Sequence, residues 1–71
     1  GEYVVGRYVD VLQALTLAGG LTPFADADNI KILRKEGGRE RIIPFNYTEV
    51  TRGRNLEQNI RLQSGDVIMV P

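Results

Sequence analysis

The chain of 71 residues contains no cysteine and no histidine, and this absence limits how it can be held together. A domain of this length buries only about 60% of the surface that its unfolded chain exposes, so many small domains add a disulfide or a structural zinc ion. Disulfides need cysteine, and structural zinc sites are built from cysteine and histidine. We therefore predict one domain over residues 1–71, held together by apolar packing and supported further by a partner.

The same absence limits the chemistry of the chain. No Ser-His-Asp triad, cysteine nucleophile, redox pair or histidine-ligated metal can be built. The acidic segment 26–29 lacks the glycine and the final glutamate of a calcium loop. Nine basic residues balance nine acidic ones, and no apolar stretch approaches the roughly 20 residues of a membrane-spanning helix. We expect a non-enzymatic protein with no catalytic residue, no cofactor, no metal and no direct membrane insertion.

A helix is predicted from Asp10 to about Ala18. Asp10 can cap the first turn and Gln13, three residues later, can reach back to it. Gly19 and Gly20 then supply the left-handed backbone that ends a helix. Apolar residues on more than one face of this segment predict a deeply buried helix: Val11, Leu12, Ala14, Leu15, Leu17 and Ala18.

A β-hairpin is predicted over residues 29–45. Residues 29–35 and 39–45 flank a Gly37-Gly38 pair, which permits the positive φ of a tight turn. Pro44 has no backbone N–H and belongs near the end or edge of its strand. Asn46 then resembles the cap of a short helix that runs to about Arg52.

The two ends of the chain predict the remaining strands. Residues 2–5 and 7–9 favour two short strands or one bent strand, and residues 67–70 favour a central strand buried on both faces. We expect loops at 22–28, with Phe24 directed inward, and at 54–61. Together these segments predict an α+β domain with a mixed sheet wrapped on one principal helix, the arrangement called β-grasp, plus a short second helix.

Apolar residues occupy both faces of the predicted sheet. One set fills a single face: Ile30, Ile32, Ile43, Phe45, Ile68 and Val70. The other set then points the opposite way: Leu33, Ile42, Val67 and Met69. One helix covers one face, so the second set predicts a buried partner surface. The alternative is that the short helix near residue 50 and the loop of Phe24 fold over it.

Polar and aromatic residues suggest a second kind of site. The flat face of a tyrosine can stack on a sugar ring, and exposed hydrogen-bond donors can bind its hydroxyl groups. The residues predicted to bind such a ligand are Tyr3, Tyr8, Tyr47, Arg52, Arg54 and Asn55. Ordinary core and surface roles for these residue types are the alternative. The hairpin is also basic, with Lys31, Arg34, Lys35, Arg39 and Arg41 against two glutamates. No aromatic residue stands among them for base stacking, so a solvated face is favoured over nucleic-acid binding.

Several segments resemble the soluble ligand binding β-grasp domain of bacterial polysaccharide export proteins. They are residues 12–15, 18–22, 30–32 with Arg34, 59–60 with Leu62, and 65–71, with 1–2 and 6–8 matching its opening strand region. One departure is that only Val9 separates Tyr8 from Asp10, where the family has several residues. This departure implies a shortened or incompletely represented first connection.

The resemblance implies a function as well as a fold. Such domains lie in the periplasm within outer-membrane-associated exporters of capsular or exopolysaccharide, where they help subunits assemble and contact the sugar chain. We therefore expect a fragment of a larger export protein whose partners are other subunits or domains of the complex, with polysaccharide as a further partner. The alternatives are a small-ligand or sugar receptor and a DNA-binding β-grasp module of a DNA-uptake protein, which would use Lys31 and Arg39.

Overall fold

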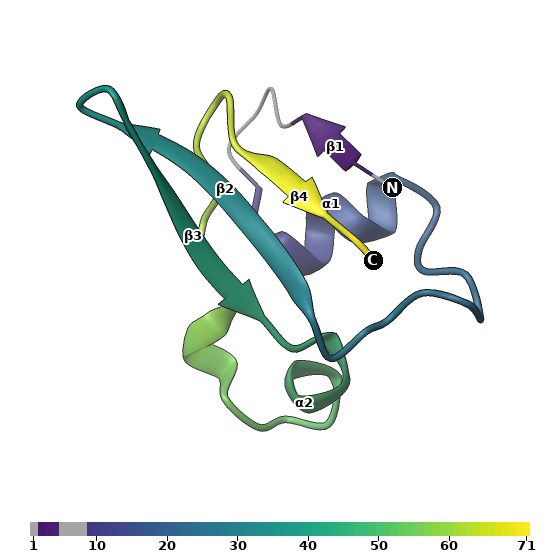
Figure 1. Ribbon diagram of the computed structural model, residues 1–71. Coiled ribbons are helices and arrows are strands. Elements are labelled where there is room, and N and C mark those ends of the chain that lie inside the picture. The colour runs from purple at the N-terminus through teal and green to yellow at the C-terminus, as the bar shows by residue number, and fades with distance from the viewer. Residues whose placement is uncertain (1, 5–8) are drawn as a thin grey trace.

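The computed structural model describes residues 2–4 and 9–71 (Figure 1). The elements follow in the order β1 (Glu2–Val4), α1 (Val11–Leu17), β2 (Ile30–Glu36), β3 (Arg39–Phe45), α2 (Tyr47–Thr51), the 3₁₀ turn η1 (Leu56–Gln58) and β4 (Val67–Met69). This order confirms the α+β class and the two helices. The strand predicted at residues 7–9 falls largely outside the described residues. The short turn η1 lies where a plain loop was predicted.

The described strands form one sheet in the order β1-β4-β2-β3. Strand β4 lies between β1 and β2, so the prediction that the last strand is central is confirmed. The three pairings, β1 with β4, β4 with β2 and β2 with β3, are all antiparallel. The expected mixed sheet is therefore wrong for the described strands. Strand β3 lies at the edge, where Pro44 removes no hydrogen bond to a further strand.

The hairpin of β2 and β3 forms as the glycine pair predicts. Gly37 and Gly38 have φ of 56° and 80°, the two positive values that a type I′ turn requires. The turn sets Glu36 opposite Arg39, and the register then continues without a bulge to Ile30 opposite Phe45. This unbroken register decides which side chains share a face of the sheet.

Helix α1 begins and ends at the predicted signals. The Asp10 side chain accepts a hydrogen bond from Gln13 N, and the Gln13 side chain accepts one from Asp10 N. At the other end, Gly20 N donates to Leu15 O and Gly19 N donates to Thr16 O, the paired bonds of a Schellman cap. The predicted deep burial is wrong, because Leu17 is 66% exposed.

The core lies between α1, α2 and one face of the sheet, which we call the inner face. Its buried apolar residues are Val11, Leu15, Ile30, Ile32, Phe45, Val50, Leu62, Ile68 and Val70. Figure 1 shows α1 behind the sheet and α2 below the end of the hairpin that is remote from the turn. The inner-face residues predicted from strand alternation are thus confirmed, with Ile43 partly buried at the margin.

One ion pair is buried beside this core. Arg34 on β2 donates from Nη2 to Asp66 Oδ2 at 2.8 Å and from Nε to Asp66 Oδ1 at 3.2 Å. The Asp66 side chain is only 2% exposed, and it also accepts a hydrogen bond from Gln63 N at 2.8 Å. The prediction of a solvated hairpin face is therefore wrong for Arg34, whose partner comes from the turn before β4.

The environment of this pair shifts both groups toward their charged forms. Burial acts to raise the pKa of Asp66, but hydrogen bonds from Arg34 and from the Gln63 amide, with the guanidinium charge, hold that pKa below its ordinary value. The hydrogen bond to Asp66 raises the pKa of Arg34. Both groups are therefore charged, and their contact attaches the segment that precedes β4 to strand β2.

Candidate interaction surface

The face of the sheet turned away from the helices, which we call the outer face, carries a cross-strand apolar row. Leu33 on β2 lies opposite Ile42 on β3 and opposite Val67 on β4. The neighbouring row sets Lys31 opposite Pro44 and Met69. These side chains share one face because residues two apart in a strand point the same way.

The described helices leave this outer face uncovered. Ile42 is 62% exposed and Met69 is 37% exposed, while Leu33 and Val67 are half-buried. The prediction that residues 67–70 are buried on both faces is therefore wrong. Neither α1 nor α2 crosses the side of the sheet that faces the viewer in Figure 1.

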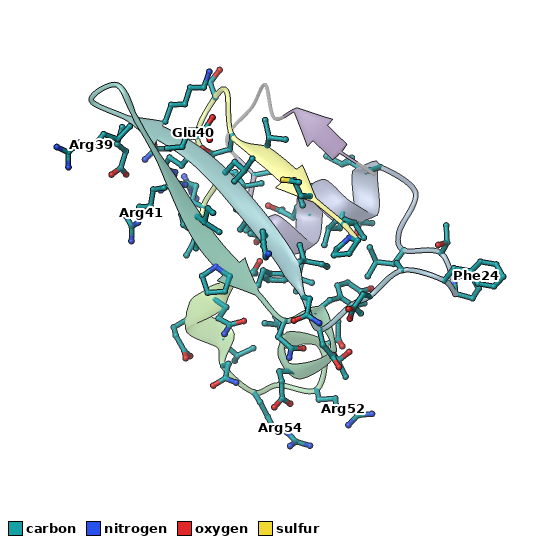
Figure 2. The ribbon with its side chains drawn as sticks, viewed as in Figure 1. Phe24, Arg39, Glu40, Arg41, Arg52 and Arg54 are labelled. Carbon is teal, nitrogen blue, oxygen red and sulfur yellow. The ribbon has the colours of Figure 1, made fainter. Side chains whose placement is uncertain are left out.

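The alternative cover for this face is contradicted by two observations. Val50 and Tyr47 of α2 pack against the inner-face core, so this helix cannot also cover the outer face. Phe24, which we predicted to anchor its loop inward, is 96% exposed and projects away from the body of the domain (Figure 2). The loop is instead held by hydrogen bonds of its backbone, because Asp26 N donates to Pro71 O and Tyr47 N donates to Ala27 O.

Charged residues border the apolar row. Lys35 lies opposite Glu40 beyond one side of the row, and Lys31 lies on its other side. Within residues 2–4 and 9–71, the ion pairs are Arg34–Asp66, Arg41–Glu36 and Arg54–Glu49, so none involves these three border residues. The outer face is thus an apolar strip with charged margins that the described residues leave unpaired.

The structure describes the side chains of four of the six members of the predicted ligand set. Tyr8 lies outside the described residues, and only the backbone of Tyr3 is described, paired with Ile68. Tyr47 packs partly buried against the core at the start of α2. Its role there is structural.

The other three members of the ligand set follow α2. Arg52, Arg54 and Asn55 are exposed, and the two arginines point away from the sheet in Figure 2. Arg54 lies 3.6 Å from Glu49, and Asn55 has a left-handed backbone with φ of 49°. Exposure and an outward direction leave these residues available to solvent, whereas Tyr47 at the start of the same helix is partly buried against the core.

Two amides that follow this segment have structural partners. Gln58 Oε1 accepts a hydrogen bond from Asn46 N at 2.8 Å, and Asn59 Oδ1 accepts one from Leu12 N at 3.0 Å. They fasten the loop to the starts of α2 and α1. Spacing along the sequence gives no signal for either bond, since the partners lie 12 and 47 residues away.

Two shallow grooves on the surface are lined by described residues. One runs along α1 and is lined by Leu12, Thr16, Leu17 and Asn59 among others. The second lies beside the exposed loop and is lined by Leu21, Phe24, Val70 and Pro71 among others. Neither groove includes a member of the predicted ligand set or of the outer face.

The described residues contain no group of three or more acidic, cysteine or histidine side chains placed to hold a metal ion. Among the described helices, none has the length and apolar character needed to cross a membrane. Comparison with known proteins gives no match to a family model, a curated protein or a solved structure. The outer face of the sheet is therefore the feature from which a function must be argued.

Proposed function

We propose that this chain is a non-enzymatic assembly domain, of β-grasp type, within an outer-membrane-associated polysaccharide export protein of the periplasm. The observation that carries the proposal is the uncovered outer face. Ile42 is 62% exposed and Met69 is 37% exposed, whereas the apolar residues Ile30, Ile32 and Ile68 on the inner face of the same sheet are buried. Contiguous exposed apolar surface of this kind is typical of protein contacts.

The sequence resemblance supplies the biological setting of the proposal. Its strongest segments are the helix and the final strand, which correspond to α1 and β4 of the structure. A single sheet over one main helix with the last strand inside the sheet supports the β-grasp assignment. The antiparallel pairing of β1 with β4 departs from the mixed sheet expected of that fold.

The proposal is tested on the protein that contains this chain, in the cells that encode it. Met69→Asp places a charge on the outer face at a side chain that is already 37% exposed. We expect this variant to lower the assembled fraction, measured by light scattering after size-exclusion chromatography, and the amount of cell-surface polysaccharide by about tenfold. A loss of about 1.4 kcal/mol at one contact is enough for such a change.

Leu17→Asp is the matched control. Leu17 is an apolar side chain of similar size that is 66% exposed on α1, away from the outer face. We expect normal assembly and normal polysaccharide from this variant. Equal behaviour of the two variants, with both proteins folded by circular dichroism, would overturn the proposal.

A further inference from the structure

We infer that the edge strand β3 pairs with β3 of a second copy of this chain, antiparallel and centred on Ile42, so that two sheets become one. The inference rests on the proposed assembly function and names the partner and the contact. Figure 1 shows β3 at the margin of the sheet, and among the described strands its only neighbour is β2. An unpaired edge of seven residues is a ready template for another strand.

The register of the hairpin shows which backbone groups of β3 are free. In an antiparallel pair, residue pairs that exchange hydrogen bonds alternate with pairs that do not. Glu36 and Arg39 close the two-residue turn and form a bonded pair, so Glu40, Ile42 and Pro44 belong to the non-bonded pairs. Their peptide groups therefore point away from β2, toward solvent.

Pro44 restricts how a second strand can pair with this edge. It has a carbonyl group but no N–H, so it accepts one hydrogen bond and donates none. When the two-fold axis passes between the two Ile42 residues, these residues lie opposite each other and exchange two hydrogen bonds. Glu40 then lies opposite Pro44 of the other copy, and each Glu40 N donates one hydrogen bond to the Pro44 carbonyl. When Ile43 instead lies opposite Ile43 of the other copy, Ile42 lies opposite Pro44. Only two hydrogen bonds then form, from each Ile42 N to a Pro44 carbonyl, because Pro44 cannot donate.

Charge disfavours the register centred on Arg41. Centring the pairing on Arg41 would give a full set of bonds between Glu40 and Ile42, but it places Arg41 directly opposite Arg41 of the second copy. Like charges that face each other across strands are destabilising. The register centred on Ile42 instead places Arg41 beside Ile43 of the other copy, and no two like charges are opposed.

The same register joins the apolar rows of the two outer faces. Val67, Leu33 and Ile42 of one copy continue directly into Ile42, Leu33 and Val67 of the other. The contact is isologous, because the same residues meet on both sides of a two-fold axis. It buries part of the Ile42 side chain that is 62% exposed in the single chain.

The absence of cysteine from the chain makes a direct test clean, because each single-cysteine variant has one reactive thiol. We would compare Arg41→Cys, Ile42→Cys and Ile43→Cys for disulfide-linked dimer formation under mild oxidation. A two-fold axis at Ile42 brings the two introduced thiols of Ile42→Cys face to face at high effective concentration. We expect it to cross-link at least about tenfold faster than the Leu17→Cys control.

A second measurement tests the same pairing without any introduced thiol. Ile42→Pro removes the outward N–H without removing a bond between β3 and β2, so the hairpin should fold. We expect the unmodified chain to be dimeric in sedimentation equilibrium and Ile42→Pro to be monomeric with unchanged circular dichroism. Equal cross-linking at positions 17 and 42, fastest cross-linking at 41, or dimers of Ile42→Pro would each overturn the inference.

These results separate the inference from the proposed function. A monomeric chain together with a loss of export in Met69→Asp would overturn the edge pairing and leave the assembly role standing. A dimer linked at Ile42, with normal export in Met69→Asp, would overturn the assembly role of the outer face and leave the edge pairing standing.

Discussion

The inner and outer faces of the sheet come from the same strands and carry similar branched apolar side chains, but they have different environments. Ile32 is fully buried on the inner face, whereas Leu33, the next residue, is half-buried and its neighbour Ile42 is exposed. Both helices pack on the inner face. Burial is thus decided by which face the helices cover, and the hydrophobicity of a residue alone does not predict it.

Two charge pairs that involve residues of the hairpin also differ in burial. Arg34, on the inner face, is paired with Asp66 at 2.8 Å in a buried contact, whereas Arg41 and Glu36 are 3.6 Å apart and both are more than half exposed. A buried charge that loses its partner is strongly destabilising, while an exposed pair contributes little. Removing the carboxylate from each of the two pairs tests this difference directly.

The largest effect is expected from Asp66→Ala. It leaves the Arg34 guanidinium buried without its carboxylate, which costs about 3–5 kcal/mol in the free energy of unfolding. That is most of the stability of a small domain. Urea unfolding followed by circular dichroism measures the loss, and Arg34→Met with Asp66→Leu should recover most of it.

The control for this prediction is Glu36→Ala, which removes the carboxylate beside Arg41. We expect a change of no more than about 0.5 kcal/mol. Similar losses in Asp66→Ala and Glu36→Ala would contradict the distinction between the two pairs.

A smaller but still large effect is expected from a pair of isoleucines. Ile32→Ala leaves a cavity in the core and should lower the free energy of unfolding by about 2–4 kcal/mol. Ile42→Ala, measured on the chain at a concentration low enough to keep it monomeric, should change it by less than about 0.5 kcal/mol. If Ile42→Ala proved as costly as Ile32→Ala, the outer face would have to be covered in the single chain.

The smallest effect is expected from pH. Because the pKa of Asp66 is lower in the folded chain than its ordinary value of 3.8, its stabilisation is complete above that value. As the pH falls from 3.8 toward the folded pKa, the Asp66 contribution should decline by about 1.4 kcal/mol per pH unit. Urea unfolding at several acidic pH values measures this slope. The double variant Arg34→Met with Asp66→Leu lacks the titrating group, so a slope equal to that of the unmodified chain would contradict the prediction.

Local signals in the sequence predicted much of the fold. The bonds of Asp10 with Gln13 and the positive φ of Gly37 and Gly38 involve residues at most a few positions apart, so their residue types are enough to place the helix start and the turn. Strand alternation likewise separated the two apolar sets. The exposed outer set was therefore predictable as a candidate surface before its surroundings were known.

Long-range contacts were not predictable in the same way. Arg34 and Asp66 are 32 residues apart and meet only because β2 and β4 are neighbours, so the sequence pattern placed Arg34 among solvated cations. Phe24 and Leu17 were expected inside because they are apolar, but both are exposed, since neither lies on a surface that packs against the core. The ligand set stays a prediction. Its members with described side chains lie in α2 and just after it, at Tyr47, Arg52, Arg54 and Asn55, and the side chains of Tyr3 and Tyr8 fall outside the described residues.

The start of α1 has a consequence for how the chain acquires its structure. Val11 N donates to Ile60 O and Leu12 N donates to the Asn59 side chain, so two of the first helical amides depend on residues almost 50 positions later. A helix of seven residues is too short to persist alone in water. The first turn of α1 is therefore complete only when residues 59 and 60 are in place, so we expect this helix and the turn η1 to become ordered together.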